Sequence, residues 1–291
     1  MIGSKITQLL LQNNYEVAIL SRNPQTYRGN AKAYHWDIDA GIIDPEALKD
    51  TQYIIHLAGA GIADKAWTKR RKETLLNSRV LSIELLHQAI TKYDHQVKGF
   101  ISASAIGYYG ADAGQHVLTE DSPSGNDFLA EVTKAWEDGA EKIHKTGIRT
   151  VKLRIGVVLS NEGGALPPLV IPIKLFIGSP LGSGKQILSW IHIEDLCRMV
   201  LFAVEYDHIK GVYNAAAPNP VSNKIFIKEA AKALKRPIIL PHVPAFALKT
   251  LLGQRAALLL GSAHASSEKI EAAGFKFEFP TLSAALQDLL E

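Results

Sequence analysis

The sequence contains little cysteine, no long apolar run and no strong excess of one charge. Its single cysteine, Cys197, excludes an internal disulfide and a cysteine-rich metal site, and its apolar neighbours predict a position in the protein core. No apolar stretch reaches the roughly 18 residues of a membrane-spanning helix. An apolar signal region before a cleavage site is also missing, so we expect a cytoplasmic protein with no membrane partner.

The charged residues are balanced, with 32 basic and 29 acidic side chains and a net charge of +3. The one basic run, KRRK at residues 69–72, lies in an amphipathic helical pattern, where a solvated helix face is a simpler explanation than a nucleic-acid patch. We therefore expect no nucleic-acid partner. A chain of 291 residues, 47% of them hydrophobic, is long enough for one α/β domain and a smaller second lobe.

Apolar strands alternate with helices in the first half of the chain. The pattern predicts helices at residues 66–93 and 127–146, and strands at residues 15–22, 52–59, 97–105 and 148–159. These strands are nearly continuous apolar runs, which indicates a parallel sheet buried between two layers of helices. The expected fold is therefore a doubly wound, Rossmann-type α/β fold, with a dinucleotide-binding domain over residues 1–160.

Residues 161–291 are expected to form a smaller, mainly helical substrate lobe. The pattern predicts a strand at residues 211–216 and helices at residues 193–206, 222–235, 244–260 and 281–290. Within this part, the segment 193–216 is expected to return to the main sheet. Ligands bind at the carboxyl edge of open parallel sheets, so the cleft between the sheet and this lobe is the default site.

Several short motifs follow one another in a specific order. They are IGS (2–4), LAGAGI (57–62), SASAIGYYG (102–110), LRIGVVL (153–159), WIHIEDL (190–196) and VYNAAAP (212–218). The chain resembles the extended short-chain dehydrogenase/reductase superfamily of NAD(P)-dependent epimerases and dehydratases. Three further segments resemble its "epimerase family protein" branch, which carries a C-terminal domain of unknown function: WTKRRKETLLNSR (67–79), DFLAEVTKAWE (127–137) and GFKFEFPTLSAAL (274–286). The resemblance covers the whole chain.

The first residues form a helical pattern that leads directly into a strand. In the superfamily a strand and a G-x-x-G-x-x-G turn precede that helix, and the turn holds the dinucleotide phosphates. Ile2 and Gly3 match the end of that turn and are implied to bind the cofactor. We expect roughly ten residues of strand and loop ahead of Met1, the alternative being a genuine deletion. The first strand and most of the turn are missing from this sequence, so we expect it to fold poorly or bind dinucleotide weakly.

The residues after the first predicted strand indicate the cofactor. Ser21 and Arg22 stand where an acidic residue would bind the ribose of NAD, and an arginine there accommodates the 2′-phosphate of NADP. NADP(H) is therefore favoured over NAD(H), unless Arg22 is simply a surface arginine. Asp37 matches an acidic residue that the resemblance places near the adenine amino group, although it could equally be a turn aspartate.

Small residues follow the second predicted strand. Leu57, Ala58 and Gly59 allow the close backbone approach that a cofactor requires, or reflect helix–strand packing. On the following helix, Ser78 is a further candidate for cofactor binding. Lys72 and Arg79 lie on roughly one face of that helix, where they either bind an anionic substrate or are ordinary surface residues.

The resemblance implies a serine and a Tyr-x-x-x-Lys pair as the catalytic groups, the lysine lowering the tyrosine pKa for proton transfer. Ser104 matches the serine, or it is a serine that ends a buried strand. The pair is missing, because Phe128 and Val132 occupy its positions. Tyr108 and Tyr109, in the loop after Ser104, are candidates for a replacement acid, or they simply pack.

The segment WIHIED implies a substrate contact rather than a metal site. The resemblance places Trp190 and His192 toward the cleft, and no second histidine follows His192 at helical spacing, so we expect no metal. GSGKQ also departs from the spacing of a phosphate-binding P-loop.

The sequence therefore supports three functional hypotheses. The first is an NADP(H)-dependent oxidoreductase or epimerase that acts on a small polar or sugar-nucleotide-like substrate. The second is a non-catalytic dinucleotide-binding sensor or scaffold, which the missing Tyr-x-x-x-Lys pair favours. The third is a polypeptide that arises from the choice of start site and has no function at this length. The resemblance also implies a homodimer through the helices at residues 66–93 and 127–146.

Overall fold

A computed structural model describes residues 1–291, apart from the side chain of Gln115. The elements of the first half are α1 (Ile2–Gln12), β1 (Ala18–Ser21), β2 (Lys32–Asp37), β3 (Ile42–Ile43), β4 (Tyr53–His56), α2 (Lys69–Lys92), β5 (Gly99–Ala105), β6 (Asp112–Leu118), α3 (Phe128–His144) and β7 (Arg149–Ile155). The later elements are β8 (Val157–Leu159), α4 (Leu166–Lys174), β9 (Ile187–Leu188), β10 (Trp190–His192), α5 (Ile193–Glu205), β11 (Gly211–Ala215), β12 (Val221–Ser222), α6 (Asn223–Ala233), α7 (Ala245–Leu252), α8 (Ala257–Leu260), β13 (Ser262–Ala265), α9 (Glu268–Ala272) and α10 (Leu282–Leu290).

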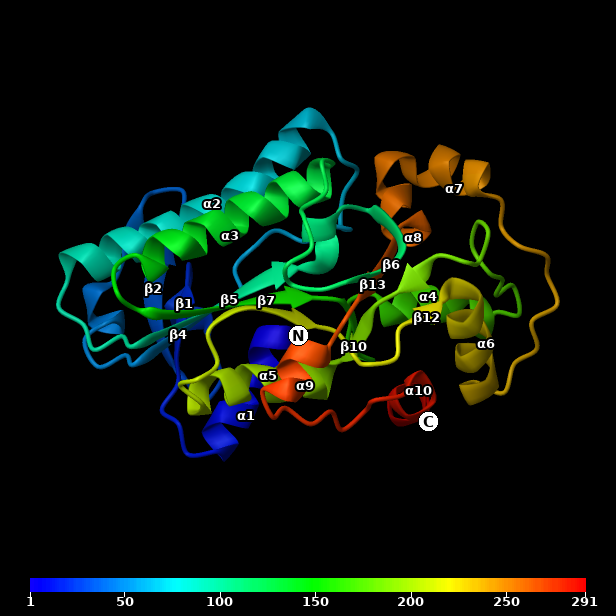
Figure 1. The fold of residues 1–291 in the computed structure, drawn as a ribbon. Coiled ribbons are helices and arrows are strands. Elements are labelled where there is room, and N and C mark those ends of the chain that lie inside the picture. The colour runs from blue at the N-terminus through cyan, green and yellow to red at the C-terminus, as the bar shows by residue number, and fades with distance from the viewer.

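A four-stranded parallel sheet, in the order β11-β7-β5-β4, forms the centre of the molecule (Figure 1). Helices α2 and α3 pack together on one face, and α1 and α5 pack together on the other. Adjacent residues of β5 point to opposite faces, so Phe100 enters the core under α2 and α3 while Ile101 enters the core under α1 and α5. This confirms the doubly wound arrangement predicted from the apolar strands.

A second sheet, in the order β1-β2-β3, lies beside the first. Strand β1 pairs in parallel with β2, from Ala18 opposite Lys32 to Ser21 opposite His35. Among the residues that the structure describes, no ladder joins β1 to β4. A cavity of about 810 Å³ separates the two sheets at this point.

Two predicted elements are interrupted at glycines. The strand expected at 148–159 is divided at Gly156, whose N–H donates to the Ala215 carbonyl and where an added Cβ would lie 2.6 Å from the Ser189 carbonyl oxygen. The chain therefore leaves the main sheet there, and β8 pairs in parallel with β10 instead. The helix expected at 244–260 was also wrong as one unit, since α7 ends before Gly253, whose φ of +58° breaks the helix.

The C-terminal segment returns to the first half of the chain. Strand β13 pairs in parallel with β6, from Ser262 opposite Asp112 to Ala265 opposite Leu118. Helix α10 packs on α6 and contributes Leu286 to the core under α1 and α5. No helix among the described residues has both the length and the apolar character needed to cross a lipid bilayer.

Candidate active site

The carboxyl ends of parallel strands meet at one edge of the sheet, and this edge holds most of the residues predicted to bind cofactor or substrate. Ser21 and Arg22 end β1, residues 57–61 follow β4, and Ser104 lies at the end of β5. In open parallel sheets, ligands bind outside the carboxyl ends of the strands. The candidate site is therefore expected at this edge.

A cavity of about 630 Å³ brings three of the predicted cofactor residues together. Arg22, Gly59 and Ser78 all line it, from β1, the loop after β4 and α2. Arg70, which was not among the residues predicted from the sequence, also lines this cavity, as do the acidic residues Asp39 and Glu73. Within the described residues neither Arg22 nor Arg70 forms a salt bridge, so their guanidinium groups are not paired with these carboxylates.

Helix α2 holds the loop after β4 in place. The Ala60 N–H donates to the Ser78 hydroxyl oxygen at 2.9 Å, and Ser78 donates in turn to the Leu75 carbonyl at 3.1 Å. A Cβ on Gly59 would lie 3.1 Å from Cζ of Arg79. A side chain at position 59 would therefore push the arginine away by a few tenths of an ångström.

Arg79 is a largely buried cation with an unusual environment. Its guanidinium donates to the Leu75 carbonyl at 2.8 Å and lies 4.8 Å above the Trp136 ring. Burial, with a smaller effect from Arg71, lowers the pKa of Arg79 to about 10. The group stays charged at neutral pH, since this value lies well above 7, and it supplies positive charge directly under the loop at residues 57–61.

A buried histidine lies beneath Arg79. His56 accepts a hydrogen bond from Nε1 of Trp136 at its Nδ1 (3.3 Å), and its Nε2 lies 2.8 Å from the Ser82 hydroxyl. Burial first, and the nearby Arg79 charge second, lower the pKa of His56 to about 3. The imidazole is therefore neutral at physiological pH and has a structural part in supporting Arg79 and Trp136.

Lys72 lies in the first turn of α2, beside Phe128, the residue that the resemblance aligns with the tyrosine. Its Nζ is 4.8 Å from the centroid of the Phe128 ring, and that ring stands edge-on to Trp67 at 5.2 Å. The Phe128 ring, which cannot transfer a proton, thus lies between the Lys72 cation and the Trp67 ring.

Ser104 belongs to a buried ionic cluster that the sequence analysis missed. Its hydroxyl donates to Oε1 of Glu137 at 2.6 Å, and Arg154 donates to both carboxylate oxygens of Glu137, at 2.8 and 2.9 Å. Ser104 is 3% exposed and Arg154 is 2% exposed. A signal was present in the sequence, because an arginine inside an apolar strand needs a buried anionic partner.

Tyr109 extends this cluster. Its hydroxyl accepts from Nη1 of Arg154 at 3.1 Å and lies 2.7 Å from Oδ1 of Asn214 and 2.9 Å from the Thr119 carbonyl oxygen. Burial raises the pKa of Tyr109, although the bond from Arg154 opposes that rise. Asn214 is itself held by the Glu120 carboxylate, which accepts its backbone N–H at 2.7 Å.

Tyr108 lies on the face of the same arginine. The Cζ atom of Arg154 is 3.4 Å from the centroid of the Tyr108 ring, so the two planes are in contact. Within the described part of the chain the Tyr108 hydroxyl has no hydrogen-bond partner. Of the three predicted catalytic residues, Tyr108 is thus the one whose oxygen is not already engaged.

Other predicted site residues lie away from this cavity. Asp37 accepts the N–H groups of Asp39 and Ala40 at 3.0 and 3.2 Å, as a turn aspartate does. Ser21 accepts the Asn23 N–H at 3.2 Å. Gly3 lines the larger cavity between β1 and β4, where Leu57 and Ala58 also lie, and Ile2 is half-buried at the start of α1.

The two substrate residues predicted in the second half are buried in the C-terminal part. Trp190 is fully buried and donates through Nε1 to the Asn219 carbonyl at 3.1 Å. His192 accepts the Glu194 N–H at 3.2 Å, which caps α5, and its ring stacks on Phe279 at 3.8 Å. Burial lowers the pKa of His192 against the opposing effect of Asp288. Neither residue lines the cavity that holds Arg22.

No group of three or more His, Cys, Asp and Glu side chains in the described part of the chain is arranged to hold a metal ion.

Two family models match the chain. "Domain of unknown function (DUF1731)" matches residues 243–289, and "NAD dependent epimerase/dehydratase family" matches residues 1–216. The chain belongs to the NAD dependent epimerase/dehydratase family. This confirms the resemblance carried by the sequence motifs.

Several known proteins are similar to this chain over all or nearly all of its length. Epimerase family protein YfhF of Bacillus subtilis is 38% identical over 291 residues, which cover 99% of this chain and 94% of that protein. The crystal structure of human epimerase family protein SDR39U1 (isoform 2) with NADPH has a TM-score of 0.86 and 30% identity, and covers 100% of this chain and 96% of the human one. A nucleoside-diphosphate sugar epimerase of Corynebacterium glutamicum has a TM-score of 0.79 and 32% identity, covering 100% of this chain and 56% of the other.

Proposed function

We propose that this family member is an NADP(H)-dependent oxidoreductase or epimerase that acts on a small polar, sugar-nucleotide-like substrate. The observation that carries the choice of cofactor is the pair Arg22 and Arg70, which line one cavity at the carboxyl end of β1 and, within the described residues, form no salt bridge with Asp39 or Glu73 in the same lining. Two such cations suit a phosphate monoester, whereas the ribose hydroxyls of NAD are best bound by an acid. The NADPH in the human SDR39U1 structure supports this choice.

The residues present fit such a cofactor. Gly59 and Ala60 bring backbone within reach of the cavity, and Ser78 fixes the Ala60 N–H. Arg79 adds charge beneath the same loop. When bound, the nicotinamide supplies hydride transfer. Every proton that moves with the hydride must then be carried by the protein.

Tyr108 is the residue that we assign to proton transfer. Ser104 and Tyr109 are bound to Glu137, Arg154 and Asn214, so their oxygens serve first to position the end of β5. The Tyr108 ring rests on Arg154, which orients its phenol without consuming the hydroxyl. Lys72 is assigned to an anionic part of the substrate, such as the phosphates of a sugar nucleotide, whereas the Arg79 guanidinium is held beneath the loop by Leu75 and Trp136.

A second candidate function is a non-catalytic NADPH-binding sensor. It is favoured by one specific observation, which is that Phe128 and a cation–π contact from Lys72 fill the place of the missing tyrosine. Turnover separates the two functions. An enzyme oxidises NADPH in the presence of some aldehyde, ketone or nucleotide sugar, and Tyr108→Phe lowers that rate at least 100-fold. A sensor binds NADPH without oxidising it.

The cofactor assignment is tested by calorimetry on Arg22→Ala. We expect about a tenfold or greater loss of NADPH affinity and little change for NADH, because a charge-assisted bond to the extra phosphate is removed. Arg28→Ala is the matched control, since Arg28 is exposed on the loop after β1 and does not line the cavity. Equal losses for NADPH and NADH would contradict the assignment.

We also infer a cytoplasmic homodimer that buries the outer surfaces of α2 and α3. The resemblance to the superfamily is what supports this inference. Light scattering on the eluting protein measures its mass, and a mass of two chains is expected. A monomeric protein would overturn the inference.

A further inference from the structure

The segments that follow α4 and α6 lie side by side at one outer edge of the molecule. The Cζ atom of Arg236, just after α6, is 4.8 Å from the centroid of the Phe176 ring, just after α4. Further along the two segments, Leu181 and Val243 form a parallel bridge, and the Val243 N–H donates to the Pro180 carbonyl at 2.9 Å. Figure 1 shows the chain between α6 and α7 running along this edge. The two segments therefore contribute to one surface.

Five large apolar side chains on these segments are exposed to solvent. Their exposed fractions are 63% for Leu175, 51% for Phe176, 56% for Ile177, 73% for Ile239 and 44% for Leu240. Prolines at positions 237 and 241 fix φ on either side of the last two, which limits how far the backbone can turn them away from water. Exposed apolar side chains gathered in this way indicate a contact with a partner or a membrane.

Both segments begin with the same kind of turn, and each turn has a large side chain where glycine is usual. The Phe176 N–H donates to the Ile173 carbonyl at 3.0 Å, and the Ile177 N–H donates to the Pro172 carbonyl at 2.9 Å, which is the pattern of a helix that ends in a left-handed residue. Phe176 has a φ of +62°, and Lys235, at the equivalent position after α6, has a φ of +53°. A side chain in this conformation costs stability that glycine would avoid. The fold of the turns therefore does not require a phenylalanine or a lysine at these positions.

The surface around these apolar side chains is basic. Residues 163–186 and 222–260 contain nine basic residues and one acidic residue, although the whole chain is nearly balanced, with 32 basic and 29 acidic residues. Lys174, Lys235 and Arg236 are exposed next to the apolar side chains, and within the described residues none of the three forms a salt bridge. Two copies of this surface would bring like charges together, which disfavours self-association. The complementary partner is an anionic one.

We propose that the surface formed by residues 174–177 and 235–240 binds a lipid bilayer that contains anionic lipids. The five apolar side chains enter the boundary between headgroups and acyl chains, while the three basic side chains contact the lipid phosphates. An acidic protein would neutralise the cations, but the combination of exposed apolar side chains with basic neighbours is typical of a peripheral membrane contact. No membrane partner was expected from the sequence, which has no long apolar run, but a surface assembled from two separate segments leaves no such run.

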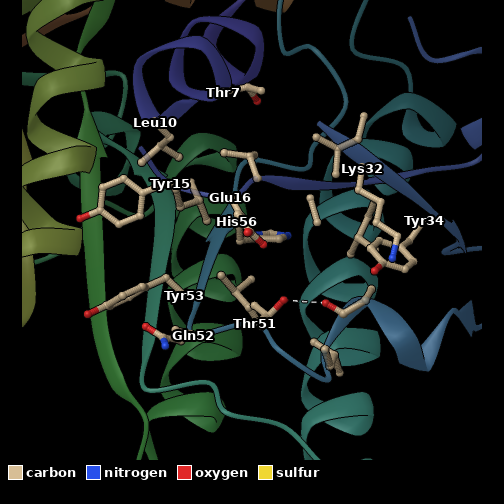
Figure 2. A pocket seen from close by; sticks show the side chains of 18 of the residues that line it. Thr7, Leu10, Tyr15, Glu16, Lys32, Tyr34, Thr51, Gln52, Tyr53 and His56 are labelled. Atoms are coloured by element: carbon tan, nitrogen blue, oxygen red, sulfur yellow. Dashed lines mark hydrogen bonds between the residues drawn. The ribbon is translucent and has the colours of Figure 1, made fainter. Parts of the chain in front are cut away.

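This surface is separate from the candidate active site. None of its residues lines the cavity that holds Arg22, or the cavity between β1 and β4 that Figure 2 shows. The inference therefore does not rest on the proposed cofactor or reaction.

Co-sedimentation of the full chain with lipid vesicles tests the proposal. The protein is expected to bind vesicles of phosphatidylcholine with about one third phosphatidylglycerol at least about tenfold more tightly than vesicles of phosphatidylcholine alone, because three cations approach the anionic surface. No binding to the anionic vesicles, or equal binding to both kinds, would overturn the proposal.

Phe176→Gly separates membrane binding from folding. Glycine suits the left-handed φ at this position, so the melting temperature should stay the same or rise. Binding to the anionic vesicles should nevertheless fall at least about tenfold, because a large apolar side chain no longer enters the bilayer. Ile239→Ser should cause a similar loss, whereas Ile42→Ser, at an exposed position on β3, is the matched control and should leave binding unchanged. Full binding by Phe176→Gly, or equal losses for Ile239→Ser and Ile42→Ser, would refute the assignment of this surface.

Arg236→Glu tests the contribution of charge. This variant should bind the anionic vesicles at least about tenfold more weakly than the parent, because a cation next to the lipid phosphates is replaced by an anion. The matched control is Lys210→Glu, which changes an exposed lysine ahead of β11 and should have a much smaller effect. Equal losses for the two variants would show that only the net charge of the protein matters, and would contradict a specific surface.

Light scattering distinguishes a bilayer from a second copy of the chain as the partner. The mass of Ile239→Ser in solution is expected to equal that of the parent. A lower mass for this variant would identify the surface as an interface between copies and would overturn the proposal.

Discussion

Replacement of Glu137 by alanine should destabilise the protein far more than replacement of Glu141, one turn later on α3. Both carboxylates accept hydrogen bonds from basic residues on β7, at 2.8 Å from Arg154 and 2.9 Å from Lys152. They differ in burial. The Arg154 and Glu137 side chains are 3% and 9% exposed, whereas the Lys152 and Glu141 side chains are 13% and 42% exposed. The pair of substitutions therefore isolates the effect of burial on an otherwise similar contact.

The expected magnitudes follow from what each change leaves behind. Glu137→Ala leaves the Arg154 charge in the protein interior with hydrogen bonds only to Tyr109 and the Glu120 carbonyl, at a cost of about 3–5 kcal/mol. Ser104 loses its acceptor in the same change. Glu141→Ala removes a contact that water screens, at a cost of about 0.2–1 kcal/mol.

Urea unfolding followed by circular dichroism measures both costs. A double-mutant cycle with Arg154→Met gives the coupling between the two buried charges, and the double variant should recover part of the stability because no lone charge is left inside. Glu137→Gln keeps the volume and one acceptor oxygen but not the charge, so its stability should fall between that of the parent and that of Glu137→Ala. Similar losses for Glu137→Ala and Glu141→Ala would refute the reasoning, because burial would then have no effect on the cost.

Two other changes test different parts of the structure. The pKa of His56 is about 3 in the folded protein, below its ordinary value of 6.5. As the pH falls below about 6.5, His56 therefore binds a proton in the unfolded chain but not in the folded protein, and the folded protein becomes less stable. The parent should lose about 2 kcal/mol more between pH 7 and pH 5 than His56→Gln in urea titrations, and parallel pH profiles would contradict this. Gly156→Ala should lower the unfolding free energy by about 2 kcal/mol or more, since its Cβ would lie 2.6 Å from the Ser189 carbonyl oxygen. Gly3→Ala is the control, because its Cβ would meet only Leu57 at 3.8 Å, and it should lower the unfolding free energy by less than about half as much. Equal losses of unfolding free energy in the two variants would show that the close approach at Gly156 is relaxed in solution.

The sequence predicts the sheet and its helices because burial on both faces leaves a direct mark. Strands such as β5 must be apolar along their whole length, and the helices between them must be amphipathic. The interruption at Gly156 was not predictable, because it depends on how closely Ser189, from a distant part of the chain, approaches in space.

The candidate site was predictable to the extent that strand ends converge. Arg22, Gly59 and Ser78 gather at one cavity because the carboxyl ends of parallel strands share an edge. The pairing of Glu137 with Arg154 depends on how α3 rests against β7, which no local pattern encodes. Trp190 and His192 were expected at the cleft, but they pack among residues of the C-terminal part, where Phe279 and Asn219 contact them.

The ladder between β6 and β13 makes the first half of the molecule depend on the last part of the chain. Asn214, which holds Tyr109, donates through Nδ2 to the Ser266 carbonyl just after β13, as well as to the Leu118 carbonyl at the end of β6. The region of unknown function thus stabilises the residues around Arg154. Exchanging that region between relatives would change the rigidity of the candidate site even where every residue of the first 216 positions was kept.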